Sequence, residues 1–382
     1  MRVLILSSST GGGHDMRAGA FQEWAQLLPD LNLTTELHRP LDSGPPLYRF
    51  GVHLYNWIQR RAPYLHHIYF NFLEVVAPCG SSRSLLGADR FRATLESMRP
   101  DVLFSVHGSL NHGFFDFARS VLGRDRIRCV TYCGELHGGY GFSRNWVNPN
   151  TDLFIGAVAE TCDAALSLGM PEEKTNLGGF LLRPQFYDAS LDDAARRAYV
   201  RDELEFEPEE FILLLSASSR GANNHIAFLN ALRRARLDVQ VVVLCGKSQT
   251  APAQIADWIS FNQSARVRII PPDTNVATLL HCVSAVLARP GTGATSEAIV
   301  SHCPLLLNCL GGIMPQEWIT VKFCRKHRVA ETIRRADDLA RIVDRWMESE
   351  DETEAIRARM NAVCPTATPR DILSTVARRE RL

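Results

Sequence analysis

Short apolar runs alternate with amphipathic stretches along most of the chain. In the first half the apolar runs lie at 3–8, 33–37, 102–108, 127–132 and 152–158, and in the second half at 211–218, 239–246, 267–272, 285–291 and 304–310. Helical spacing is found between them, for example at 18–28, 114–122, 224–236, 254–261 and from 295 onward. Continuous apolar strands that alternate with helices are typical of parallel sheets covered on both faces. The pattern therefore predicts two doubly wound α/β domains.

A charged segment separates the two halves of this pattern. Between 184 and 210 the chain carries Pro184, Pro208 and many acidic and basic residues, which is the composition of a linker rather than of a core. We expect an N-terminal Rossmann-like domain at 1–185, a linker at 186–208, a second Rossmann-like domain at 209–365, and a C-terminal helix at 366–382 that packs back on the first domain.

Composition narrows the class of protein. The 382 residues are 46% hydrophobic and 22% charged, with a formal net charge of zero, which argues against binding of nucleic acid through an overall basic field. The ten cysteines are scattered and fit neither a disulfide framework nor zinc-finger spacing, so reduced core thiols are expected. No apolar run is long enough for a signal peptide or a bilayer span. A cytoplasmic protein is expected.

The first apolar strand runs into SSSTGGGH, which ends at His14. A strand, a glycine-rich turn and a helix resemble a dinucleotide-binding fingerprint. The spacing fails, however, because the third glycine of G-x-G-x-x-G counted from Gly11 falls on Met16. This excludes the obvious dehydrogenase interpretation and leaves His14 facing the carboxyl end of a sheet, where open α/β sheets bind ligands.

A second glycine cluster follows a strand in the other half, in AVLARPGTGATSEAI at 285–299. Free N–H groups at a helix start and the positive end of the helix dipole favour an anion such as a pyrophosphate. Glu297 can accept hydrogen bonds from a ribose diol. Gln316 and Glu317 follow the next strand, and a carboxamide beside a carboxylate suits adjacent sugar hydroxyls.

Taken together, TGGGH, VLxRPGTGATSEAI and PQE resemble glycosyltransferase family 28, and within it the monogalactosyldiacylglycerol synthases and bacterial diacylglycerol glucosyltransferases. PDVLFSVHG at 100–108, WVNPNTDLFIGAV at 146–158 and GMPEEKTNLGGFLLRPQF at 169–186 agree with the same family. The likeness covers about residues 1 to 330. It implies a GT-B fold, a UDP-sugar donor in the C-terminal domain and a lipid acceptor in the N-terminal domain.

The expected site combines the motifs with this resemblance. His14 is the expected catalytic base. The expected acceptor side comprises Gly12, Gly13, His107, Trp57 and Arg60. The expected donor side comprises Ser218, Arg220, Gly246, Lys247, Arg289, Gly291, Thr292, Gly293, Ala294, Glu297, Gln316 and Glu317. No cofactor and no metal site are expected, because the chain has no DxD motif and the N–H groups near Thr292 can stabilise the departing UDP instead.

The chain departs from the family pattern at several positions. The glycine-rich loop that opens the second domain reads SASSRG at 216–221, Thr320 stands where the last motif has Asn, and Thr131 is followed by Tyr132 instead of Asp. A glycine-rich stretch at 138–141 is inserted. The order Asp15-Met16-Arg17 after the histidine also differs from the plant enzymes, which indicates a separate subgroup.

The segment from 47 to 72 is rich in aromatic residues and arginines, and no acidic residue lies between Asp42 and Glu74. Aromatic rings and cations on an amphipathic segment suit the surface of an anionic membrane, while a helical pair packed on the N-terminal sheet explains the same pattern. Both interpretations stay open. The first adds peripheral contact with the inner face of the cell membrane.

The reaction expected from these features is inverting transfer of galactose or glucose from a UDP-sugar to a lipid hydroxyl. Two alternatives have the same fold: an enzyme that uses UDP-N-acetylglucosamine, either a peptidoglycan-precursor transferase or an epimerase, and a catalytically silent nucleotide-sugar-binding protein.

Overall fold

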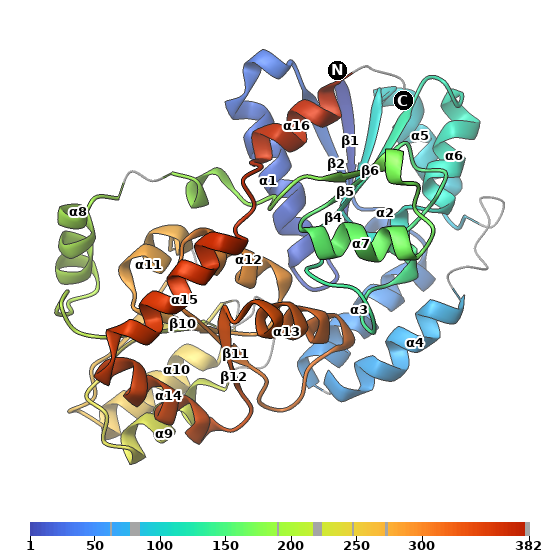
Figure 1. The fold of residues 1–382 in the computed structure, drawn as a ribbon. Coiled ribbons are helices and arrows are strands. Elements are labelled where there is room, and N and C mark those ends of the chain that lie inside the picture. The colour runs from blue at the N-terminus through green and yellow to red at the C-terminus, as the bar shows by residue number, and fades with distance from the viewer. Residues whose placement is uncertain are drawn as a thin grey trace.

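The computed structural model describes residues 1–61, 63–76, 85–188, 191–216, 224–246, 248–271 and 274–378. Two six-stranded parallel sheets form its frame (Figure 1). The first has the order β2-β1-β3-β4-β5-β6 and the second β12-β11-β10-β7-β8-β9. The predicted fold class, two doubly wound α/β domains, is therefore confirmed.

Ten of the twelve strands that the structure describes coincide with the predicted apolar runs, and the edge strands β6 and β12 were not predicted. The first sheet contains β1 (Arg2–Leu6), β2 (Thr34–His38), β3 (Val102–Ser105), β4 (Arg128–Cys133), β5 (Leu153–Gly156) and β6 (Thr175–Leu177). The second contains β7 (Ile212–Ser216), β8 (Gln240–Leu244), β9 (Val267–Ile270), β10 (Ala285–Ala288), β11 (Leu305–Asn308) and β12 (Ala330–Ile333). Every residue of β3, β5, β10 and β11 is buried, which explains why these strands show no alternation of polar and apolar positions.

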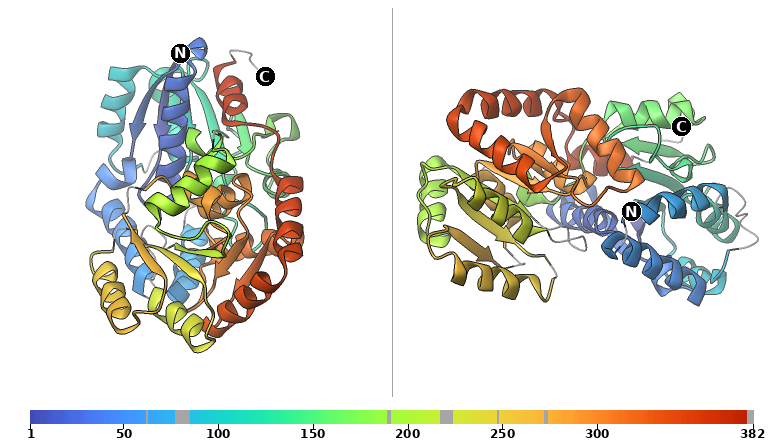
Figure 2. Two further views of the ribbon diagram at one scale, coloured as in Figure 1. Left: turned by 90° about the vertical axis from the view of Figure 1, so that its left-hand side faces the viewer. Right: turned by 90° about the horizontal axis from the view of Figure 1, so that it is seen from below.

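Helices cover both faces of each sheet (Figures 1 and 2). Those of the first half are α1 (Gly13–Leu27), α2 (Pro40–Ser43), α3 (Pro46–Arg61), α4 (His66–Val76), α5 (Ala88–Met98), α6 (Gly113–Leu122) and α7 (Ala159–Ser167). Those of the second half are α8 (Asp193–Ala198), α9 (His225–Arg234), α10 (Ala251–Phe261), α11 (Val276–Cys282), α12 (Thr292–Val300), α13 (Pro315–His327), α14 (Ala336–Glu348), α15 (Glu350–Val363) and α16 (Pro369–Ala377).

The last helix returns to the first half of the molecule. After α15 the chain crosses back, and α16 lies beside α1 (Figure 1). Arg370 of α16 pairs with Asp30 at 2.7 Å, and Arg128 at the start of β4 donates to main-chain carbonyls at the end of α16. The chain therefore passes between the two sheets twice.

The strand order places one switch point in each sheet. Strand order reverses between β1 and β3 in the first sheet and between β7 and β10 in the second. A crevice opens at such a point, outside the carboxyl ends of the strands. The glycine motif that follows β1 and the one that follows β10 therefore both lie where this fold binds ligands.

Candidate active site

The loop after β1 is held by side chains from three elements. Asp15 of α1 accepts hydrogen bonds from the hydroxyls of Ser7 at 3.0 Å and Ser9 at 3.1 Å. Asp42 accepts from the Ser9 N–H, and Asn56 of α3 accepts from the Gly11 N–H at 3.1 Å. Gly11 has a φ of 78°, in the left-handed region that favours glycine. The turn is thus fixed, and it delivers the chain into α1 with His14 in its first turn.

His14 is held in one tautomer. Its Nδ1 lies 2.7 Å from the carbonyl oxygen of Val106, which follows β3, and only a protonated Nδ1 can donate to a carbonyl. Burial is the main reason that the pKa of His14 lies well below its usual range, and His107 and Arg17 lower it further. The imidazole is therefore neutral near pH 7, with the lone pair of Nε2 available to accept a proton.

His107 is a second neutral imidazole against the first. The two ring centroids are 4.3 Å apart. Nδ1 of His107 accepts from the N–H of Ser109 at 3.2 Å, so Nε2 carries the proton and donates to the Thr10 hydroxyl at 2.9 Å. Burial lowers the pKa of His107 to about 4. The structure brings Gly12, Gly13, His14 and His107 together at one switch point.

The loop after β10 leads into α12. Gly291 caps this helix with extended backbone, and Thr292, Gly293 and Ala294 form its first turn. A side chain at Gly291 would meet nothing within 4 Å, so the space in front of the helix is open. The N–H groups of the first turn have no partner within the helix, which makes the turn a site for an anion.

Arg289 and Glu317 are engaged with each other, which corrects the roles expected for them. Nε and Nη2 of Arg289 both donate to the Glu317 carboxylate, whose Oε2 also accepts from the Met314 N–H at 2.8 Å. Arg289 donates as well to the carbonyl of Gly312 at 3.0 Å. Arg289 is 8% exposed and Glu317 5%. The pair fixes the start of α13, and both side chains are thus engaged mainly within the protein instead of being held ready for the donor.

Gln316, beside Glu317, has an amide oxygen that is not engaged within the described residues. Its Oε1 is buried and has no hydrogen-bond partner among the described residues. A buried amide oxygen without a partner is costly, and the hydroxyl of a ligand is one group that satisfies it. Gln316 therefore remains a candidate for sugar recognition at the start of α13.

Glu297 lies in the second turn of α12. Burial raises the pKa of its carboxyl to about 7, and the positive charges of Arg183 and Arg17 oppose the rise. Gly246, with a φ of 55°, follows β8 at the carboxyl edge of the same sheet. Ser218, Arg220 and Lys247 lie outside the described residues.

Two buried charged residues of the first domain were not singled out from the sequence. Arg17, on α1, is 4% exposed, and its Nη2 donates to the Gly134 carbonyl at 2.9 Å and across the cleft to the Thr292 hydroxyl at 2.5 Å. Glu135, after β4, is 7% exposed, and its Oε2 has no partner among the described residues. Burial raises the pKa of Glu135 to about 7 against the influence of Arg17. Spacing along the chain gives no signal for either residue, although Arg17 stands on the same helix as His14.

The inserted loop at 138–141 also crosses the cleft. Gly141 has a φ of 104°, and a Cβ at this position would overlap the carbonyl oxygen of Pro315 at the start of α13. Nearby, His67 of α4 lies 3.1 Å from the Ile313 carbonyl oxygen. The first domain therefore contacts both elements that are expected to hold the donor, α12 and α13.

Helices α3 and α4 present large apolar side chains to solvent. The most exposed of them, from 50% to 70%, are Leu47, Phe50, Trp57, Tyr64, Ile68, Phe72 and Val75. Other residues of the same helices, such as Val52, Ile58 and Phe70, are buried. Trp57 therefore lies on the surface and not at the histidines. Arg60 lies in α3, and its side chain is outside the described residues.

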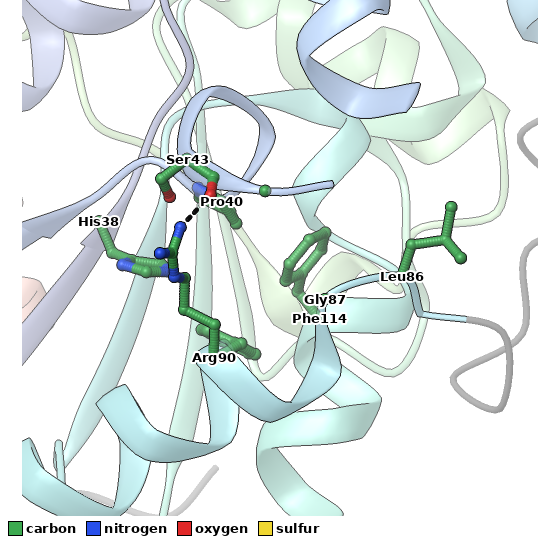
Figure 3. A pocket seen from close by; sticks show the side chains of 9 residues that line it. His38, Pro40, Ser43, Leu86, Gly87, Arg90 and Phe114 are labelled. Atoms are coloured by element: carbon green, nitrogen blue, oxygen red, sulfur yellow. Dashed lines mark hydrogen bonds between the residues drawn. The ribbon is translucent and has the colours of Figure 1, made fainter. Parts of the chain in front are cut away.

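A small hollow lies elsewhere in the first domain, between α2, α5 and α6 (Figure 3). It is lined by His38, Ser43, Arg90 and Phe114 among others, and Arg90 donates to the Ser43 carbonyl. Its volume of about 10 Å³ holds at most one water molecule. The hollow is too small for a sugar.

Within the described ranges, no three His, Cys, Asp or Glu side chains are grouped as a metal ion requires. Over the same residues, none of the helices combines the length and the apolar character needed to cross a bilayer.

Comparison of sequences finds relatives among plant galactolipid synthases. The chain is 23% identical over 378 residues to monogalactosyldiacylglycerol synthase 2 of Arabidopsis thaliana, covering 92% of this chain and 75% of that protein. It is also 23% identical to the probable monogalactosyldiacylglycerol synthase 3 of Oryza sativa subsp. japonica, covering 90% of this chain and 67% of that protein. No protein-family model matches the chain.

Comparison of structures finds the same two-domain architecture in solved proteins. MurG of Acinetobacter baumannii matches with a TM-score of 0.62 at 12% identity, covering 98% of this chain and 99% of that one. Alr3699/HepE of Anabaena in complex with UDP-glucose matches with a TM-score of 0.58 at 13% identity, covering 99% and 98%. The UDP-GlcNAc 2-epimerase of Neisseria meningitidis bound to UDP-GlcNAc matches with a TM-score of 0.62 at 12% identity, covering 98% and 99%. At such identity the likeness shows the fold. Together, the fold and the relatives confirm the resemblance to glycosyltransferase family 28 and identify the chain as a glycosyltransferase of the GT-B fold.

Proposed function

We propose that the protein transfers a hexose from a UDP-sugar to the hydroxyl of a lipid acceptor such as diacylglycerol, with inversion at the anomeric carbon. The observation that carries this proposal is the state of His14. Its tautomer is fixed by Val106, its low pKa keeps it neutral, and its element faces the cleft opposite the open N-terminus of α12. The names of the plant relatives point to galactose and a diacylglycerol, and the UDP-glucose complex of the Anabaena protein makes glucose the other hexose to test.

The proposed chemistry is a single displacement. The acceptor oxygen forms a bond to the anomeric carbon while its proton passes to Nε2 of His14. The bond from the anomeric carbon to the diphosphate breaks, and its electron pair leaves with UDP. Free N–H groups at Thr292, Gly293 and Ala294 stabilise the negative charge that develops on the leaving oxygen, so no divalent metal is required.

The direct test incubates the purified protein with UDP-galactose or UDP-glucose and diacylglycerol in mixed micelles, with the lipids analysed by mass spectrometry. We expect a hexosyl lipid, a β-anomeric coupling in its proton NMR spectrum, and the same rate in EDTA. His14→Ala should lower kcat by about 10²- to 10⁴-fold while UDP still binds. His281→Ala, on α11 outside the site, is the matched control. A protein that converts UDP-N-acetylglucosamine to its epimer, or that binds UDP-sugars without any product, would refute the proposal.

The exposed face of α3 and α4 supports contact with a membrane. Seven large apolar side chains face solvent on this pair of helices and the short turn that joins them, and the exposed Arg49 stands beside them. An apolar face with nearby cations suits insertion at the interface of an anionic bilayer. Because His67 of α4 also touches the start of α13, a bilayer at this face would lie next to the cleft and supply the lipid acceptor directly.

This contact is tested by sedimentation with vesicles of phosphatidylcholine, with and without one third phosphatidylglycerol. We expect the double substitution Ile68→Ser and Phe72→Ser to reduce binding to the anionic vesicles about tenfold or more, with turnover of a short-chain, detergent-soluble diacylglycerol retained. Phe261→Ser is the matched control, because Phe261 is 87% exposed on α10 of the other domain. Equal binding by all three proteins would contradict the contact.

A further inference from the structure

Arg17 is a buried cation that forms no ion pair with any of the residues the structure describes. It is 4% exposed, and none of the ion pairs among the described residues involves it. Among those residues, its hydrogen bonds go to two neutral oxygens, those of Gly134 and Thr292. Burying an uncompensated charge is strongly unfavourable, and none of the carboxylates that the structure describes pairs with this guanidinium, so a bound anion would stabilise it.

The position of Arg17 beside a helix N-terminus makes its buried positive charge still more unfavourable. Thr292 is the first residue of α12, so the guanidinium lies against the positive end of a helix dipole. A cation is normally found at the other end of a helix, and two positive groups in contact repel each other. An anion bound between the guanidinium and the helix N-terminus would be attracted to both, which replaces their repulsion by two favourable interactions.

Two carboxyls of the described residues act electrostatically on Arg17, but neither carries a full negative charge near neutral pH. Glu135 and Glu297 are the carboxyls on which Arg17 acts electrostatically, and burial raises the pKa of each to about 7. Each is therefore only partly ionised near neutral pH. Independently, the Oγ1 of Thr295, in the first turn of α12, belongs to a fully buried residue and has no partner among the described residues. An unsatisfied hydroxyl at the same helix end is a second sign of a missing ligand.

We infer that Arg17, from the first domain, binds the diphosphate of the nucleotide sugar together with the N-terminus of α12 and stabilises the charge on the departing UDP. The inference rests on the proposed function, which it deepens by naming the cation of a metal-free leaving-group site. With Arg17 at the diphosphate, Arg289 is not needed there and can pair with Glu317 instead. Charge-assisted hydrogen bonds from a guanidinium fit phosphate oxygens well, and they cost no reorganisation when the guanidinium is already fixed.

The test compares ligands that differ only in their phosphates. UDP and uridine are titrated calorimetrically into the wild-type protein and into Arg17→Met and Arg17→Lys. We expect Arg17→Met to weaken UDP binding by about 10- to 100-fold and to leave uridine binding unchanged, with Arg17→Lys intermediate. The value of kcat for Arg17→Met should fall about 10²- to 10³-fold, and guanidinium ion added to Arg17→Ala should restore part of it.

The matched control is Arg183→Met. Arg183 also acts on Glu297, but it is about half exposed and pairs with Glu23, so its removal should not change the ratio of UDP to uridine affinity. Unchanged UDP affinity in Arg17→Met would overturn the inference, and so would an equal loss for UDP and uridine, which indicates a structural role. If UDP binding depends on Arg17 while the wild type makes no glycolipid, the proposed reaction fails and the role of Arg17 stands.

Discussion

Two buried arginines flank the start of α12, and their surroundings differ. Arg289, at the end of β10, is satisfied from within its own domain by the Glu317 carboxylate and the carbonyl of Gly312. Arg17, on α1, crosses the cleft and meets only neutral oxygens among the described residues. Both are less than a tenth exposed. The paired charge of Arg289 stabilises the fold, whereas the charge of Arg17, which lies beside the open N-terminus of α12, is available to bind a ligand.

The comparison also separates two kinds of carboxyl. Glu317 accepts three hydrogen bonds and forms a close ion pair. Glu135 and Glu297 have raised pKa values, because burial outweighs the influence of Arg17 at each of them. A carboxyl that pairs with a guanidinium is thus engaged, whereas Glu135 and Glu297, which form no ion pair within the described part of the chain, are partly protonated near pH 7.

The largest expected effect comes from breaking the pair at Arg289. Glu317→Gln removes the negative charge that pairs with the buried Arg289 guanidinium and leaves that cation in place. We expect the free energy of unfolding to fall by about 3 to 5 kcal/mol. Urea titration measures it. The control is Glu331→Gln, which breaks a half-exposed pair with Arg345 and should cost less than about 1 kcal/mol. Equal losses in the two variants would show that the Arg289 pair is no more important than a surface pair.

A smaller effect concerns pH. The pKa of Glu135 and of Glu297 is about 7 in the folded protein, above the value near 4.3 of an exposed Glu. The folded state therefore holds more protons between these values. The stability that these groups contribute is fully present below about pH 4.3 and is lost as pH rises through 7. The double variant Glu135→Gln, Glu297→Gln should flatten the decline between pH 5 and pH 8, as measured by urea unfolding. A slope identical to that of the wild type would disprove it.

The smallest expected effect is on the other arginine. Arg17→Met removes a charge that has no ionic partner among the described residues and keeps the apolar stem, so the free energy of unfolding of the ligand-free protein should change by less than about 1 kcal/mol or rise. The stabilisation that saturating UDP adds should be reduced in this variant, because it depends on affinity. Thermal melts with and without UDP measure both quantities. A loss as large as that of Glu317→Gln would mean that Arg17 is compensated within the protein.

Much of the fold could be predicted from the sequence, because parallel strands that are buried on both faces consist of uninterrupted runs of apolar residues. The runs at 3–8, 211–218 and 285–291 each contain an observed strand, β1, β7 and β10. Helix starts were less predictable. The sequence suggested a helix from 18, whereas α1 begins at Gly13, which places His14 inside the helix. The expected start at 295 is Thr292 in the structure. Glycines at both starts conceal the first turn, because their helix propensity is low.

The site was predictable only as far as its elements were. The strand order brings the motifs after β1, β3 and β10 to the two switch points, so that His14, His107 and Thr292 could be expected near the cleft. The partners could not be expected, because they depend on packing between distant segments. The hydrogen bond from Arg17 to Thr292 joins residues 275 positions apart, and the pairing of Arg289 with Glu317 spans 28. Neither distance carries a periodic signal.

The return of α16 to the side of α1 sets the mechanics of the molecule. The chain links the two sheets once between β6 and β7 and again between α15 and α16. Two chain crossings define an axis, so we expect the easiest motion of one domain relative to the other to be a hinge rotation about that axis. Arg17 lies on α1, the helix that α16 contacts, and Thr292 lies at the start of α12 in the second domain. Their hydrogen bond therefore joins the two halves at a point away from both chain crossings, so Arg17→Met would remove a restraint on this rotation.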